Sequence, residues 1–178
     1  MSAFTLIVPG IPQPQGSTRA FVVKGRAVVT SANPKVKSWR ADAMAALSQH
    51  DEVPHFTGGV LAELIFVFPR PVIHYNSKGV VKDRFAAMPK ATKPDVDKLA
   101  RSGLDFLTMA GIVKDDAQVT RVTASKRFVQ EGEVPYSLIY VREWEEMASV
   151  AAVQNLPQRG GGKAARRNEL GVSDESGD

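Results

Sequence analysis

Apolar side chains recur along the chain at two spacings, one typical of strands and one typical of helices. Short β-prone runs predict strands at residues 4–8, 20–23, 27–30, 60–68, 118–128 and 136–141. The second and third runs flank Lys24-Gly25-Arg26, which predicts a hairpin with a basic tip. The last two flank a loop around Gly132, which predicts a second hairpin. Prolines follow the first run at once, so we expect it at the edge of a sheet or in a loop.

Two segments carry apolar residues at helical spacing. The first begins at the capping pair Asn33-Pro34, and its packed face is predicted to hold Val36, Trp39, Ala43 and Leu47. The second spans residues 95–110 and ends at Gly111, and its packed face is predicted to hold Leu99, Gly103, Phe106, Leu107 and Ala110. Residues 72–92 lack a clear period and predict a long basic loop. Strands combined with two main helices predict an α/β (α+β) fold.

Length and composition bound the architecture. The chain has 178 residues, 43% of them hydrophobic, which predicts one domain over residues 1–146. The composition becomes polar and glycine-rich near the end, so we expect an extension at 147–178 that is disordered from about residue 155. The run at 60–68 is too short to span a bilayer and no signal peptide is apparent, so no membrane partner is expected.

The chain contains no cysteine and three scattered histidines, His50, His55 and His74. The absence of cysteine excludes disulfides, thiolate nucleophiles and zinc–thiolate sites. Scattered histidines give no support to a histidine-rich metal site, because such a site needs clustered ligands.

Positive charge is unevenly distributed. The first forty residues contain six Lys or Arg and no acid, and a second basic stretch covers residues 70–101. A polyanionic partner would explain this asymmetry, although a net charge of +4 also fits a role in solubility alone. The candidate DNA contacts are Arg19, Lys24, Arg26, Lys93 and Lys98.

Acidic residues lie at both ends of the second predicted helix. Asp95 and Asp97 stand at its start, where a carboxylate can cap the helix and meets the positive end of its dipole. Asp115 and Asp116 follow its end, about 20–25 Å away at about 1.5 Å per residue. Either the intervening turn brings the acids together or a partner subunit does, and the spacing leaves both open.

Carboxylates without cysteine or clustered histidine match the preference of Mg²⁺ and Mn²⁺ for oxygen ligands. Two such ions can activate water and hold the leaving oxygen in phosphodiester hydrolysis. Lys98 or Arg101 could hold the scissile phosphate beside them, although Arg101 and Asp105 could equally form a surface pair one helical turn apart.

Three segments of the chain resemble the RusA family of Holliday-junction resolvases. These are Lys93-Pro94-Asp95-Val96-Asp97-Lys98-Leu99, Leu104-Asp105, and Gly111-Ile112-Val113-Lys114-Asp115-Asp116-Ala117-Gln118-Val119. The loop from Pro12 to Ser17 is more loosely similar to the opening of that family. The resemblance implies a small mixed sheet with two main helices and a homodimer whose paired helices bring the acids together.

The resemblance also implies residue roles. Asp95, Asp97 and Asp116 would be the catalytic acids that bind Mg²⁺ (or Mn²⁺), with Asp115 as a neighbouring ligand. Arg101 would replace a catalytic lysine. The implied substrate is the four-way junction and other branched DNA, cut during recombination, repair or phage DNA processing in the cytoplasm of a bacterial or phage-infected cell.

Two departures from the family pattern define an alternative. Lys98 stands where the family has Asn, and Arg101 where it has Lys. Arg and Lys differ in geometry at a phosphate, so a branched-DNA-binding protein with impaired catalysis is the second hypothesis.

A third hypothesis is another Asp-x-Asp enzyme, such as a phosphatase or sugar-nucleotide transferase. In those enzymes the motif follows an apolar strand, whereas here Lys93-Pro94 precedes it.

Overall fold

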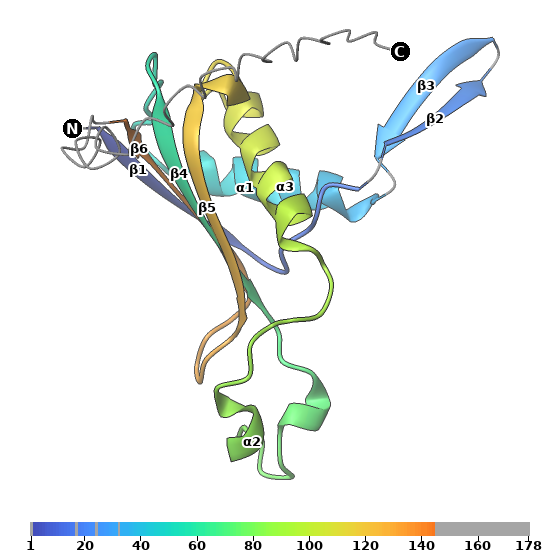
Figure 1. Ribbon diagram of the computed structural model, residues 1–178, viewed down its shortest axis with the longest axis vertical. Coiled ribbons are helices and arrows are strands. Elements are labelled where there is room, and N and C mark those ends of the chain that lie inside the picture. Colours follow the sequence, from blue (N-terminus) through green and yellow to red (C-terminus); the bar gives the residue numbers. More distant parts are fainter. Residues whose placement is uncertain (1, 17, 24, 32, 145–178) are drawn as a thin grey trace, which may run out of the picture. The chain divides into compact units, whose positions relative to one another are not determined.

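The computed structural model describes residues 2–16, 18–23, 25–31 and 33–144 (Figure 1). Its elements are β1 (Ala3–Pro9), β2 (Thr18–Val23), β3 (Arg26–Ser31), α1 (Lys35–Leu47), β4 (Val60–Phe68), η1 (Val72–His74), α2 (Asp83–Ala86), α3 (Val96–Met109), η2 (Asp116–Gln118), β5 (Val119–Phe128) and β6 (Tyr136–Glu143). The extension predicted at 147–178 lies outside the described residues. Within them, no helix is long and apolar enough to cross a membrane.

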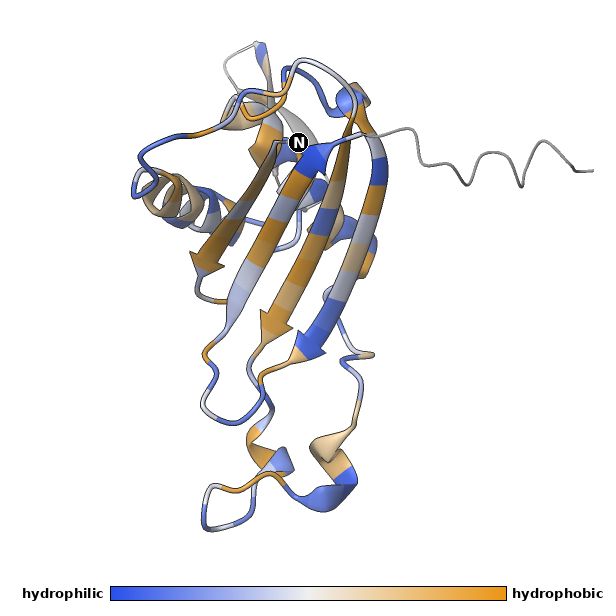
Figure 2. Ribbon diagram, turned by 90° about the vertical axis from the view of Figure 1, so that its left-hand side faces the viewer, coloured by the Kyte–Doolittle hydropathy of each residue, from blue (hydrophilic) through white to orange (hydrophobic). Residues whose placement is uncertain are grey.

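Four strands form one mixed sheet in the order β1-β6-β4-β5. The β1–β6 and β6–β4 pairs are antiparallel and the β4–β5 pair is parallel. The two main helices, α1 and α3, lie on one face of this sheet (Figure 1), and Figure 2 looks at the opposite face. This is the predicted α/β fold with a small mixed sheet and two main helices. The predicted edge position of β1 is also confirmed.

The core lies between this sheet and the two helices. All four residues predicted for the packed face of α1 are buried, and Trp39 Nε1 donates a hydrogen bond of 3.2 Å to Ser137 Oγ on β6. On α3, Gly103 packs so closely on β4 that a Cβ there would lie 3.1 Å from a methyl carbon of Leu64. The glycine therefore lets α3 approach the central strand. Gly111, with φ of 70°, ends this segment as predicted.

The hairpin between β2 and β3 is confirmed, whereas the second predicted hairpin is wrong. Strands β5 and β6 do not pair, because β4 lies between them and pairs with both. Most of β4 is buried on both faces, so it needs a neighbour at each edge, while half of the residues of β5 are exposed, which suits an outer position. The segment 72–92 is also more ordered than predicted, since it contains η1, α2 and a bridge between Tyr75 and Val81.

The connection from β5 to β6 is held by an ion pair. The Arg127 guanidinium donates to both carboxylate oxygens of Glu133, at 2.6 and 2.8 Å, and also to the Tyr136 hydroxyl at 3.1 Å. The hydrogen bonds from Arg127, with one from the Gln130 amide, lower the pKa of Glu133 to about 2.

Because of this ion pair, we expect the free energy of unfolding to decrease as the pH falls from about 4.5 to about 2. A carboxyl with a lowered pKa stabilises the fold fully above its ordinary pKa of 4.5, and the contribution is lost as the pH falls toward 2. We expect Glu133→Gln to lower the melting temperature at neutral pH and to flatten its decrease over that window. The control is Glu131→Gln, an exposed neighbour. Identical pH profiles for Glu133→Gln and the wild type would contradict the prediction.

Candidate active site

Asp95 occupies the N-cap position of α3, but its side chain caps nothing. Its Oδ2 instead lies 3.0 Å from Lys98 Nζ, one turn into the helix. The hydrogen bond and charge of Lys98 lower the pKa of the Asp95 carboxyl, and the charges of Lys93 and Lys126 contribute further. The capping role expected from the sequence is therefore replaced by an ion pair that keeps Asp95 ionised and close to the surface.

The other candidate residues at this end of α3 are exposed. Asp97 lies in the first helical turn and Arg101 one turn later. Lys93 and Lys98 are also exposed, as a contact to DNA phosphate requires. The structure therefore brings Asp95 and Asp97 to one helix start with two lysines beside them.

Two further lysines hold the loop before Asp95. The ammonium of Lys90, a residue only 7% exposed, donates to Thr92 O, Thr92 Oγ1 and Lys93 O at 3.0, 2.7 and 2.5 Å. Lys126 on β5 donates to Thr92 O at 2.9 Å and to Pro94 O at 2.7 Å. Burial and the charge of Lys126 lower the pKa of Lys90. Both ammonium groups thus fix the backbone that presents Asp95.

Sequence reasoning missed this pair of lysines. It grouped Lys90 with a surface basic stretch, and Lys126 lay in a strand without a specific role. The sequence gives only a weak signal for these contacts, because the lysines donate mainly to backbone carbonyls, and every residue has one. Lys90 also lies over the rings of Phe68 and Phe128, at 5.0 and 5.6 Å from their centroids.

At the other end of α3, Asp115 and Asp116 have different surroundings. Asp115 caps η2, since its Oδ1 accepts from Ala117 N at 2.8 Å. Gln118 completes this capping box and donates to Phe56 O and Gly58 O, each at 3.0 Å. Asp116 is exposed and its carboxylate has no hydrogen bond or ion pair within the described part of the chain. The Asp-x-x-Gln spacing could have predicted the capping role of Asp115.

Asp105 is engaged in linking the two main helices. Its Oδ2 lies 2.9 Å from Arg40 Nη2 on α1, and the same nitrogen donates to Gln15 Oε1 at 3.1 Å. The predicted pairing of Arg101 with Asp105 is not formed. Asp105 thus supports the packing of α1 and the N-terminal loop against α3.

The acids at the two ends of α3 line different pockets. Asp95 lines one of about 500 Å³, and Asp105, Asp115 and Asp116 line another of about 460 Å³. Within the described residues, no group of three or more His, Asp or Glu is arranged to hold a metal ion. The helix of 14 residues between them is about 20 Å long. Of the two alternatives left open by the spacing, the turn after α3 does not bring the acids together within one chain.

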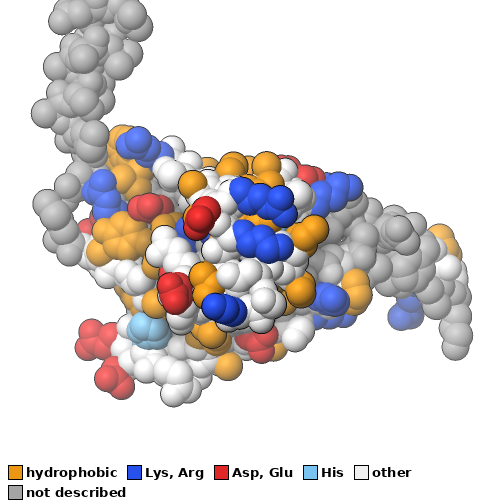
Figure 3. Space-filling view, turned by 90° about the horizontal axis from the view of Figure 1, so that it is seen from below, with side chains coloured by type: hydrophobic (Ala, Val, Ile, Leu, Met, Phe, Trp, Pro, Cys, Tyr) orange, Lys and Arg blue, Asp and Glu red, His pale blue; other side chains and the backbone are white. Residues whose placement is uncertain are grey.

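The candidate DNA contacts outside α3 are only partly described. Arg26 is exposed at the start of β3, whereas Lys24 and the side chain of Arg19 lie outside the described residues. The face that carries η1 and α2 shows Lys and Arg side chains among apolar ones (Figure 3). The exposed apolar residues of this segment include Val72, Ile73, Val80 and Met88.

Carboxylates beside exposed lysines, here on a mixed α/β scaffold, are the residue types that metal-assisted chemistry on a polyanion uses. The family model described as Endodeoxyribonuclease RusA matches residues 9–136, which include every described candidate residue. The chain therefore belongs to the RusA family of endodeoxyribonucleases, whose activity is Holliday-junction resolution. No curated protein matches the chain significantly.

The ion pair between Asp95 and Lys98 makes a direct prediction. Replacing Lys98 by Asn, the residue of the family pattern, removes the hydrogen bond and charge that stabilise the ionised Asp95. We expect the pKa of Asp95 to rise in Lys98→Asn, measured by NMR titration of its carboxyl carbon. Lys93→Asn should raise it less, because Lys93 acts through charge alone. An unchanged titration of Asp95 in Lys98→Asn would count against the ion pair.

Proposed function

We propose that this protein is a Mg²⁺- or Mn²⁺-dependent, structure-selective endonuclease that cuts Holliday junctions and other branched DNA in recombination, repair or phage DNA processing. The observation that carries the proposal is that Asp97 and Asp116 are exposed and Asp95 is partly exposed, all within the part of the chain that matches the family. The proposed domain covers residues 1–146, and the proposed location is the cytoplasm of a bacterial or phage-infected cell.

The carboxylates fit a hard divalent cation in chemistry, but the described residues of one chain bring no three candidate ligands together. When bound, such an ion supplies a deprotonated water and neutralises charge on the phosphate. Asp95 and Asp97 would hold it at the start of α3, with Asp116 as the third ligand. Asp115 remains a further candidate ligand through Oδ2, because its Oδ1 is used in capping.

A homodimer paired through α3 would complete this set. Asp97, Arg101, Leu104, Asp105 and Thr108 follow one another at helical spacing and form a stripe along α3 that is open to solvent at least in part. Within it, Leu104 also packs against the core and Asp105 pairs with Arg40. If two such helices pair antiparallel at the level of Gly103, Arg101 of one subunit faces Asp105 of the partner subunit. The start of one α3 then meets the end of the other, where Asp116 lies.

The basic residues have separate proposed roles. Arg101 would contact the scissile phosphate or the partner subunit, since it is exposed and unpaired within the described residues. Lys93 and Lys98 would hold phosphates beside Asp95, and Arg19, Lys24 and Arg26 would contact an arm of the junction.

One observation favours the second candidate function, a branched-DNA-binding protein with impaired catalysis. Lys98 Nζ lies 3.0 Å from Asp95 Oδ2, one of the two oxygens through which Asp95 could bind a metal ion. If this ion pair blocks the metal, the double variant Lys98→Asn/Arg101→Lys should cut junctions that the wild type only binds. Cutting by the wild type itself, or no gain in the double variant, counts against impairment.

Asp116→Asn should abolish cleavage of a four-way junction while binding persists, because it removes a metal ligand and leaves the basic residues intact. Asp105→Asn is the matched control: it weakens the partly exposed ion pair with Arg40 and the proposed contact with Arg101 of the partner subunit, each worth less than about 1 kcal/mol, and should still cut. Gel assays with Mg²⁺ measure cleavage, and assays with Ca²⁺ measure binding. Full cleavage by Asp116→Asn would refute the assignment.

Mixing variants tests whether two subunits share each site. Asp95→Asn and Asp116→Asn should each be inactive alone, yet a heterodimer of the two regains one complete site if the acids come from different subunits. Nicking should therefore return after subunit exchange. A mixture of Asp95→Asn with Asp97→Asn is the control, because both changes affect the same end and no complete site can form. Absence of nicking in the first mixture, despite heterodimer formation, would show that the shared arrangement is wrong.

A further inference from the structure

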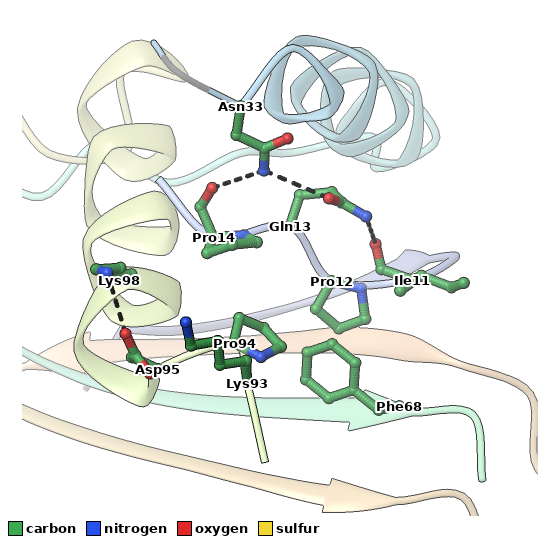
Figure 4. A pocket seen from close by; sticks show the side chains of 10 residues that line it. All are labelled: Ile11, Pro12, Gln13, Pro14, Asn33, Phe68, Lys93, Pro94, Asp95 and Lys98. Carbon is green, nitrogen blue, oxygen red and sulfur yellow. Dashed lines mark hydrogen bonds and ion pairs between the residues drawn. The ribbon is translucent and has the colours of Figure 1, made fainter. Parts of the chain in front are cut away.

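The pocket beside Asp95 has a lining that suits a flat ring. It measures about 500 Å³ and is lined by Ile11, Pro12, Gln13, Pro14, Asn33, Phe68, Lys93, Pro94, Asp95 and Lys98. The rings of Pro12, Pro94 and Phe68 lie together at one end (Figure 4), and Phe68 is only 5% exposed. These rings offer apolar contact to a planar group and no charge of their own.

The opposite wall offers hydrogen-bonding groups that are already oriented. Asn33 Nδ2 donates to Pro14 O at 3.0 Å and to Gln13 Oε1 at 3.4 Å, and Gln13 Nε2 donates to Ile11 O at 3.1 Å. Figure 4 shows both amides facing the space above the rings. The Asn33 amide is used within the wall, since its Oδ1 also accepts from Lys35 N. Gln13 Nε2 keeps a second hydrogen, which can meet the polar edge of a ring with its side chain already ordered.

The walls of the pocket are also fastened to each other. Gln15 N donates to Lys98 O at 2.9 Å, which joins the N-terminal loop to α3. On the other side, Lys90 and Lys126 hold the carbonyls of Thr92, Lys93 and Pro94. The pocket is thus formed before any ligand arrives, as most small-molecule sites are.

The rim selects among ligands with a flat ring. Lys93 and Lys98 bring two ammonium groups to the mouth, next to Asp95 (Figure 4). An apolar side chain of a protein partner would leave these charges unused. A nucleotide uses all three features: its base fills the ring-lined end, the base edge meets the Gln13 amide, and its phosphate lies at the lysines.

We propose that this pocket takes one unstacked nucleobase of the DNA strand whose phosphate lies at Asp95. The inference rests on the proposed nuclease function and deepens it, because it supplies a source of selectivity for branched DNA. Drawing a base out of a paired helix costs a few kcal/mol, and the cost is least where the base is already unpaired. Base pairs at a branch point can lack a stacking neighbour across the junction, so drawing out one of their bases costs less than doing so within an uninterrupted duplex.

The contact between the nucleobase and the pocket is tested by two kinds of change, removal of a base from the DNA and filling of the pocket in the protein. Abasic sites are placed one at a time beside the branch point of a four-way junction, and affinity is measured in Ca²⁺. Gln13→Trp and Ile11→Trp fill the pocket from half-buried and exposed positions of the N-terminal loop. Gln49→Trp, at an exposed glutamine outside the pocket, is the matched control. Melting temperatures report whether each variant is folded.

For the wild type and Gln49→Trp, one abasic position should lower affinity about ten-fold, the effect of losing one stacked base. Both filled variants should bind the intact junction about ten-fold more weakly than the wild type. The abasic site should then cost them nothing more, and their binding of linear duplex should be unchanged. An abasic penalty that persists undiminished in both filled variants, or wild-type affinity of both for the intact junction, overturns the proposal.

Cleavage in Mg²⁺ is measured separately from binding. The position-specific abasic effect without any cutting would overturn the nuclease function and keep the nucleobase pocket. Cutting without any position-specific abasic effect would keep the nuclease function and overturn the nucleobase pocket.

Discussion

A straight α-helix keeps its two ends apart, and this constraint governs the whole site. In this chain α3 is about 20 Å long, with Asp95 and Asp97 at its start and Asp116 beyond its end. Gly103 leaves α3 little room to move toward the sheet, because even a Cβ added there would lie 3.1 Å from a methyl carbon of Leu64. While α3 stays straight, Asp116 of the same subunit stays at the far end from Asp95 and Asp97, and the antiparallel pair of α3 helices proposed above would join them.

The charges at the start of α3 affect the binding of a polyanionic substrate and of a divalent cation in opposite ways. A polyanionic substrate favours the lysines, whereas a divalent cation favours bare carboxylates. Here Lys98 favours the substrate at the expense of the cation, because its ammonium occupies an oxygen of Asp95. Both groups are about half exposed, so the ion pair is weak and can exchange. Approach of a DNA phosphate would draw Lys98 away and leave Asp95 open to a metal ion.

The sequence predicted those features that depend on local pattern. The buried face of α1, the stop at Gly111 and the edge position of β1 follow from spacing, glycine and proline chemistry. The pairing of β5 with β4 did not follow, because two adjacent strands joined by a short loop fit a hairpin locally. The hairpin is excluded by the sheet order, in which β5 and β6 pair with opposite edges of β4. The RusA resemblance was confirmed by the family match, while the residue roles that it implies remain proposals.

The lysine contacts were beyond any sequence pattern, yet they tie the site to the fold. Lys126 reaches from the sheet to the carbonyls before Asp95, and Gln15 joins the N-terminal loop to the first turn of α3. Arg40 then links the middle of α3, through Asp105, to α1. Because all these contacts end on α3 or on the loop before it, the carboxylates and the nucleobase pocket are fixed to one rigid element. Pairing of two such helices would therefore set the distance between two pockets as well as between two sets of acids, and a symmetric four-way junction presents two strands related by that same symmetry.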